Sequence, residues 1–455
     1  MRRPGIRSLA GGAAGIVAGV IGGIGLSSVS AAGGPAPAAP GLDAVHVPPV
    51  LTRPGEPITL RYAIVCAPSD DGEPCDGAGS VQVRAGQSGG FRELTLRRGE
   101  DSSEGRYFVD LPLEIASSRA GFSYYATLRD RTSGATITVP AGGAAAPQRS
   151  VPLGDAAEIA LGVHVFGRDR APEAHVVAAA WGSGVGEAGL AGSRELGFAG
   201  PSSFDVAADG TVAVLDQVNG RVERWTRAGV KATNVEVSGG LADFALEPGG
   251  VLDVLEPPSR ATPAPVLRSF RADGTLRWAQ RLSDRTWAKL VAGPTGPVVQ
   301  QQPSEQWRPV AEHDAALDRT AQARHGRPGQ PFAGGREVVV ERVGVGELRL
   351  AEAMGDAVVR SWRITSATPL GEVQLAEPHG DHLVVVMKTY TQNRSEYRVL
   401  VLDRSGLANS FAVESLEWAE SAPLARFRLA GSSLYRLGST RAGLSVDRFD
   451  LEVPR

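Results

Sequence analysis

The feature that most constrains this chain is a degenerate repeat of short strands and tight turns in its C-terminal part. The clearest copy is Pro201–Gly229, in which apolar runs are separated by the dipeptides Asp209-Gly210 and Asn219-Gly220. Asp-Gly and Asn-Gly supply the positive φ that two-residue β-hairpins require. The copy therefore predicts a meander of antiparallel strands.

Further copies recur at roughly forty to fifty residues, the period of four-stranded propeller blades. They occupy residues 241–282, 379–413 and 426–449, and the irregular segments 287–331 and 334–374 are assigned as copies by their length. A region spanning residues 155–455 at this period predicts about six blades, with five or seven as alternatives.

The final copy ends before a fourth strand, because the chain stops at Arg455. His175–Trp181 precedes the first copy and reads as a strand that can pair with the last one. We expect this strand to complete the final blade, which removes exposed sheet edges.

The first copy resembles the NHL repeat over about 50 of 455 residues. The positions that match its pattern are Pro201, Asp209, Gly210, Asp216, Asn219, Arg221, Trp225 and Gly229. Later copies lose the Asp-x-x-Asn-x-Arg element, and the second has Glu256-Pro257-Pro258-Ser259-Arg260 there. Most NHL propellers are binding platforms, and a few exported relatives are lyases or metal-dependent enzymes. The resemblance implies a binding platform, with an enzyme as the alternative.

Residues 42–140 alternate apolar and polar side chains in short runs with turns about every ten residues, the pattern of a β-sandwich. The stretch Gly105–Val139 resembles the last strands of immunoglobulin-like sandwiches attached to bacterial secreted proteins. The matching residues are Tyr124, Tyr125, Ala126, Asp130 and Gly134. The resemblance implies a spacer or an adhesive platform and no particular ligand.

Cys66 and Cys75 are the two cysteines of the chain, and a polar loop separates them. In an exported protein such a pair is most simply a disulfide that closes an inter-strand loop. A redox pair usually has two intervening residues, and a zinc site needs further Cys or His nearby. We therefore expect a structural disulfide.

The N-terminus has the pattern of an export signal. Arg2, Arg3 and Arg7 form a positive region, and Leu9–Leu26 contains only apolar residues and glycine. Cleavage after Ala31 fits the small-residue rule for secretory signals. An uncleaved membrane anchor is the alternative, because eighteen such residues almost span a bilayer.

The predicted organisation is all-β. It comprises a signal peptide (1–31), a linker (32–41), an immunoglobulin-like β-sandwich (42–140), a second linker (141–154) and a β-propeller (155–455). The formal net charge of −3 and the absence of a basic patch argue against nucleic acid as a partner.

The densest group of potential ligands is His379-Gly380-Asp381-His382, but it falls where the repeat places a hairpin turn. His313 and His325 lie in a polar, turn-rich segment, and His164 and His175 alternate with valine. The glycine run Gly182–Gly189 resembles a phosphate-binding loop but lacks the strand–helix context of one. Asp209 and Asp216 are accounted for by turns. The sequence therefore assigns no catalytic residue, metal or cofactor.

These observations favour an exported, non-enzymatic binding or scaffold protein with an unknown protein, glycan or small-molecule ligand. Two alternatives remain, an exported propeller enzyme (a lyase or metal-dependent hydrolase) and an envelope protein tethered to the membrane by its signal. The enzyme hypothesis requires at least two His or carboxylate groups close together at one mouth of the propeller.

Overall fold

The computed structural model of this chain is almost entirely β-strand. It describes residues 42–65, 76–100, 105–193, 197–238, 240–258, 264–282, 287–301, 306–310, 329–355, 357–419 and 424–451. All of them belong to one of the chain's two contact units, Gly41–Arg455. The predicted signal (1–31), the linker 32–41 and both cysteines, Cys66 and Cys75, lie outside the described residues. No helix within the described ranges is long and apolar enough to cross a membrane.

Two antiparallel sheets with one shared hydrophobic core form the N-terminal folded region. The predicted alternation is present: Val81 and Val83 on one strand, and Tyr124 and Ala126 on the next, are fully buried. The first sheet contains β1 (Asp43–Val45), β3 (Thr59–Val65), β7 (Arg106–Asp110) and β6 (Arg97–Arg98). The second contains β10 (Gln148–Arg149), β8 (Phe122–Asp130), β4 (Gly77–Ala85), β5 (Arg92–Thr95) and β9 (Thr136–Val139), and the short helix α1 is Leu113–Ala116.

Contacts between this region and the repeats begin at a pair of short strands. β2 (Leu51–Thr52) pairs in parallel with β11 (Val151–Pro152). Leu51 is buried in a cluster that includes Val339 of the repeats. Arg349 donates a hydrogen bond to the Leu51 carbonyl at 3.1 Å and forms a 2.8 Å ion pair with Glu56. Apolar packing and a satisfied guanidinium therefore join the two regions.

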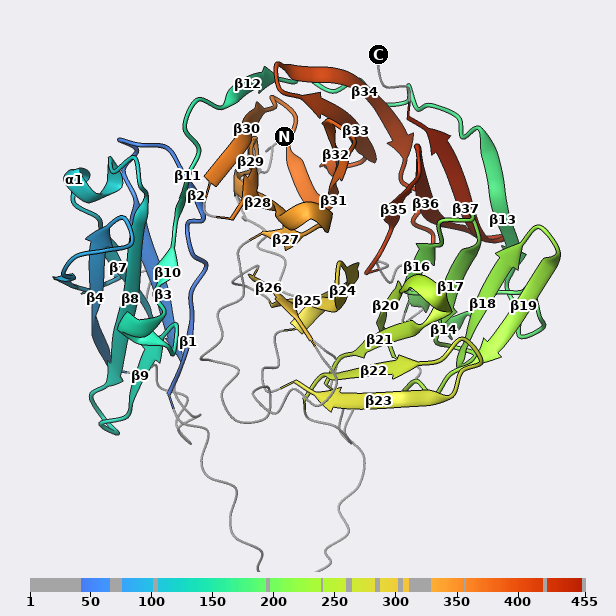
Figure 1. Ribbon diagram of the computed structural model, residues 1–455, viewed down its shortest axis with the longest axis horizontal. Helices are drawn as coiled ribbons and strands as arrows, with labels where there is room; N and C mark the ends of the chain where they lie inside the picture. Colours follow the sequence, from blue (N-terminus) through green and yellow to red (C-terminus); the bar gives the residue numbers. More distant parts are fainter. Residues whose placement is uncertain are drawn as a thin grey trace, which may run out of the picture. The chain divides into compact units, whose positions relative to one another are not determined.

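In the repeat region, consecutive strands form successive sheets (Figure 1). The first two are β16 (Ser203–Val206), β17 (Val212–Asp216), β18 (Arg221–Thr226), β19 (Gly229–Asn234), and β20 (Asp243–Leu246), β21 (Leu252–Glu256), β22 (Val266–Phe270), β23 (Leu276–Arg281). The third sheet contains β24 (Trp287–Gly293), β25 (Gly296–Gln301) and β26 (Gln306–Pro309). The fourth contains β27 (Gln330–Pro331), β28 (Arg336–Gly344), β29 (Glu347–Met354) and β30 (Ala357–Thr365), and β12 (Ala157–Ala160) pairs in parallel with β30.

The last two sheets are β31 (Leu370–His379), β32 (His382–Tyr390), β33 (Ser395–Asp403), β34 (Gly406–Glu414), and β35 (Phe427–Ala430), β36 (Ser433–Thr440), β37 (Gly443–Asp450), β13 (Ala174–Ala180). The hairpin of β14 (Ala191–Ser193) and β15 (Gly197–Ala199) precedes the first repeat. The meander predicted at Pro201–Gly229 is confirmed, and its two turn glycines, Gly210 and Gly220, have φ of 83° and 63°.

The prediction that an N-terminal strand completes the last sheet is also confirmed. β13 pairs antiparallel with β37, with Ala179 opposite Leu444. Val177 is buried and packs in one cluster with Val446. The strand pairing thus connects the start of the repeat region to its end.

Neighbouring sheets contact one another in chain order. β16 contacts β20, β20 contacts β24, β26 contacts β27, β28 contacts β31, and β31 contacts β35. β35 in turn contacts β16, so the series returns to its beginning. Successive antiparallel sheets arranged in such a ring define a β-propeller.

We predict that a charge at Val177 destabilises the whole propeller, because it would be buried without a partner in the β13–β37 pair. Val177→Asp should lower the free energy of unfolding by about 3 kcal/mol or more. Chemical denaturation followed by far-UV circular dichroism measures the change. Val163→Asp is the matched control, since Val163 is 74% exposed. Equal stability of the two variants would contradict the role of β13.

Candidate functional site

A cavity of about 500 Å³ lies among the first strands of the propeller. Its volume is within the ~300–1,000 Å³ range of small-molecule sites. It is bordered mainly by β24, β28, β31 and β35. The charged residues that line it are Asp243, Lys289, Arg342, Glu372, Glu377 and Arg428, and the uncharged polar ones include Gln300, Trp307, Gln330 and Gln374.

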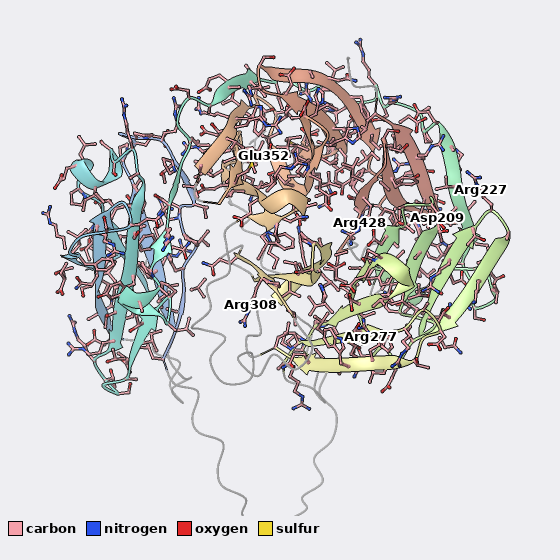
Figure 2. The ribbon with its side chains drawn as sticks, viewed as in Figure 1. Asp209, Arg227, Arg277, Arg308, Glu352 and Arg428 are labelled. Atoms are coloured by element: carbon pink, nitrogen blue, oxygen red, sulfur yellow. The ribbon has the colours of Figure 1, made fainter. Side chains whose placement is uncertain are left out.

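The guanidinium of Arg428 forms part of the inner wall, between β35 and the strands β16 and β20 (Figure 2). Its Nε donates to the Phe204 carbonyl at 2.9 Å and its Nη2 to the Phe244 carbonyl at 3.0 Å. Oδ1 of Asp205 lies 3.7 Å from Nε, and Oδ1 of Asp243 lies 4.0 Å from Nη2. One side chain of β35 therefore binds the backbones of two further blades and faces two carboxylates.

The carboxylate of Asp243 is held by groups from the two neighbouring sheets. It accepts hydrogen bonds from the Ser203 hydroxyl at 2.8 Å and from the Leu290 amide at 2.6 Å. Asp205 accepts one from the Leu246 amide at 2.8 Å. Burial raises the pKa of Asp205, while the nearby Arg428 charge opposes that shift. Both carboxylates thus bridge neighbouring first strands.

Glu377 lies half-buried in the cavity wall near the end of β31. Burial raises the pKa of its carboxyl group to about 7, with the charge of Asp205 adding to the shift. Arg428 and a hydrogen bond from Gln330 act in the opposite direction. Because its pKa is close to neutral pH, Glu377 can donate or accept a proton within the cavity.

Two other cations line the cavity, and each has a partner. Lys289 Nζ on β24 forms a 2.9 Å ion pair with Glu372 Oε1 on β31. Arg342, which is exposed, donates to the Leu370 carbonyl at 3.2 Å. These contacts connect β24 and β28 to β31 around the cavity.

The structure confirms that His379-Gly380-Asp381-His382 is a hairpin turn. His379 pairs with His382 across the β31–β32 connection, and Gly380 has φ of 58°. Neither histidine lines the cavity.

The remaining described histidines of interest have separate partners. His164 Nε2 lies 2.7 Å from Glu396 Oε2, and His175 Nδ1 lies 2.6 Å from Asp447 Oδ1. His313 and His325 lie outside the described residues. The part of the chain that is described contains no group of three or more His, Cys, Asp or Glu that could hold a metal ion. His164 and His175 therefore each pair with a different carboxylate.

The Asp-x-x-Asn-x-Arg element has a structural role. Arg221 is buried and donates to the carbonyls of Ser183 and Gly184, both at 2.7 Å, and to that of Glu187 at 2.8 Å. Its Nε lies 3.3 Å from Asp216 Oδ2. The glycine run that resembles a phosphate-binding loop is therefore anchored by its carbonyl groups.

The two carboxylates considered as mouth residues also have local roles. Asp209 caps its own turn by accepting a hydrogen bond from the Thr211 amide at 2.9 Å, and it lies near Arg227 (Figure 2). Asp216 is buried and accepts from the Gly189 amide at 3.2 Å. Neither residue lines the cavity.

Sequence reasoning missed the residues that do form the cavity, notably Lys289, Glu377 and Arg428. These side chains come from first strands in different copies of the repeat. A search for charged residues within the first strand of each copy would have found them, because those strands surround the axis of a propeller.

No known family and no curated protein sequence matches the chain. Among solved structures, virginiamycin B lyase from Staphylococcus aureus is 8% identical, with a TM-score of 0.32, over 55% of this chain and 95% of that one. The WD40 β-propeller domain of Doa1 is 9% identical, with a TM-score of 0.31, over 54% and 92%. A streptogramin B lyase is 9% identical, with a TM-score of 0.29, over 72% and 90%. Likeness at this level supports no inference about function, and the propeller assignment rests on the strand pairing.

We predict that Arg221 stabilises the first repeat. Arg221→Met removes its hydrogen bonds and leaves Asp216 and Glu223 without their ion-pair partner. The free energy of unfolding should fall by about 3–5 kcal/mol, as measured by chemical denaturation. In the control, Arg227→Met at an exposed position, it should change by less than about 0.5 kcal/mol. A similar loss in both variants would refute this role for the motif.

We also predict a pH-dependent stability term from Glu377. A carboxyl whose pKa is higher in the folded state binds more protons when folded, so ionising Glu377 lowers stability as the pH rises from about 4.5 to about 7. Glu377→Gln has no carboxyl group at this position and so does not lose stability in this way. The stability of the variant relative to the original protein should therefore increase as the pH rises across that range. Burial also raises the pKa of Asp253 to about 7. Asp253 is present in both proteins, so its contribution cancels in the difference between their stabilities. Denaturation curves at pH 5 and pH 8 test this, and a constant difference would contradict it.

Proposed function

We propose that this protein is an exported, non-enzymatic binding protein whose propeller holds a small polar ligand in its central cavity. The observation that carries the proposal is the 500 Å³ cavity, which combines charged and uncharged polar side chains from several first strands. A small number of polar groups at fixed positions in a preformed cavity is the usual basis of small-molecule specificity.

The proposed architecture is an immunoglobulin-like sandwich followed by a six-bladed, NHL-like propeller. Two antiparallel sheets around one core support the sandwich. The sheets that begin at β16, β20, β24, β27, β31 and β35 are the proposed blades. The Asp216, Asn219 and Arg221 element supports the NHL-like assignment of the first blade.

Export is proposed from the sequence of residues 1–31, and a Cys66–Cys75 disulfide is proposed with it. We propose a protein, glycan or small-molecule partner and no nucleic acid, since the net charge is −3. Contact with a membrane follows only if the signal is not cleaved. A tethered envelope protein is the corresponding alternative.

An exported propeller enzyme, such as a lyase, is the second candidate function. The observation that favours it is Glu377, whose pKa of about 7 and position in the cavity suit a general acid or base. The charge of Arg428 also acts on the Glu377 carboxyl group. The two functions differ in whether the ligand leaves the protein chemically unchanged, which mass spectrometry of the recovered ligand determines.

We predict that filling the cavity abolishes ligand binding. Val291 lines the cavity and is partly exposed to it, so Val291→Trp places an indole there. A library of neutral and charged small molecules is screened by thermal shift, since a ligand of the folded state raises the melting temperature. Hits should lose their shift in Val291→Trp and keep it in Val343→Trp, the control at a 48% exposed position outside the cavity. Shifts that persist in Val291→Trp would contradict binding in the cavity.

A further inference from the structure

The charges that line the cavity balance one another. Three acidic and three basic side chains line it. Lys289 is paired with Glu372, and Arg428 lies between Asp205 and Asp243. Arg342, the third base, is exposed and donates to the Leu370 carbonyl. An anionic ligand would compete with the acids for Lys289 or Arg428, and a cationic ligand would compete with these two bases for the acids. Because the lining has equal numbers of acids and bases, it does not favour an ion of either sign.

The open edge of β31 forms a large part of the wall. Seven consecutive residues, 371–377, line the cavity. Side chains alternate between the two faces of a strand, so a consecutive run presents the strand edge. Within the described residues β31 pairs only with β32, and β24 pairs only with β25. Such edges present backbone N–H donors next to C=O acceptors.

The polar side chains of the wall repeat this mixture of donors and acceptors. The amides of Gln330 and Gln374 each offer both. Glu377 adds a carboxyl group that accepts when ionised and also donates when protonated. Trp307 on β26, which is 9% exposed, contributes an aromatic ring to the cavity lining. Hydroxyl groups suit this wall because each of them both donates and accepts.

We infer that the cavity binds a neutral polyhydroxylated ligand, a mono- or disaccharide. The inference rests on the proposed binding function and specifies its ligand class. Hydroxyl groups of the sugar would bond the β31 edge and Glu377, and a C–H face of the ring would pack against Trp307. A carboxylate or amine substituent would disturb the existing pairs at Lys289 and Arg428.

The experiment is isothermal titration calorimetry of the full chain with glucose, galactose, mannose, maltose, cellobiose and trehalose. The best binder is then compared with its 2-amino or uronic acid analogue. We expect one neutral sugar to bind, its charged analogue to bind at least tenfold more weakly, and Glu377→Leu to weaken binding about tenfold. Glu377→Gln keeps the hydrogen-bonding capacity and should retain most of the affinity. Val343→Trp, the control outside the cavity, should bind as the original protein does.

The possible failures are distinguishable. Binding of no sugar in the panel, or equal or tighter binding of the charged analogue, overturns the inference about ligand class and leaves the cavity as a site for another ligand. Sugar binding that Val291→Trp does not reduce overturns both the ligand class and the proposed function. Sugar binding that is lost in Val291→Trp and unaffected by Glu377→Leu overturns the assigned contacts.

Discussion

The packing at the centre of this protein depends on the contacts of the Arg428 guanidinium group. It donates to carbonyls of β16 and β20 from its own strand, β35, and it faces Asp205 and Asp243. Without it, two carbonyl groups and two carboxylates near the axis would lose their cationic partner. Unpaired buried polar groups are costly, so this one side chain helps to fix how three blades meet. The charge of Arg428 also opposes the rise that burial causes in the pKa of Glu377.

Much of the fold could be predicted from sequence because turn chemistry and strand alternation are local signals. Asp209-Gly210 and Asn219-Gly220 favour hairpins, and the structure has antiparallel strands on both sides of each. The pairing of β13 with β37 was predictable for a different reason, since a final blade of three strands leaves an edge that must be covered. Propeller topology then follows from the number and order of the meanders.

The pattern of motifs did not predict the cavity, because the cavity brings together side chains that are distant in the sequence. Lys289 and Glu372 pair across eighty-three residues, and Lys289 lies in a segment where the repeat is irregular. The prominent candidates in the sequence were His and Asp in turns, where local hydrogen bonds explain them. Asp209 caps a turn, and His379 and His382 form a hairpin. The Arg221 motif was recognisable, but its contacts show that it anchors a loop rather than binds a ligand.

The proposed function places the ligand site among the first strands of the propeller. A crystal structure of the protein grown with its bound ligand tests this most directly. We expect ligand density between β24, β31 and β35, in contact with the edge of residues 371–377 and with Glu377. Density on the sandwich, or on the outer strands of the propeller with the cavity filled only by water, would contradict it.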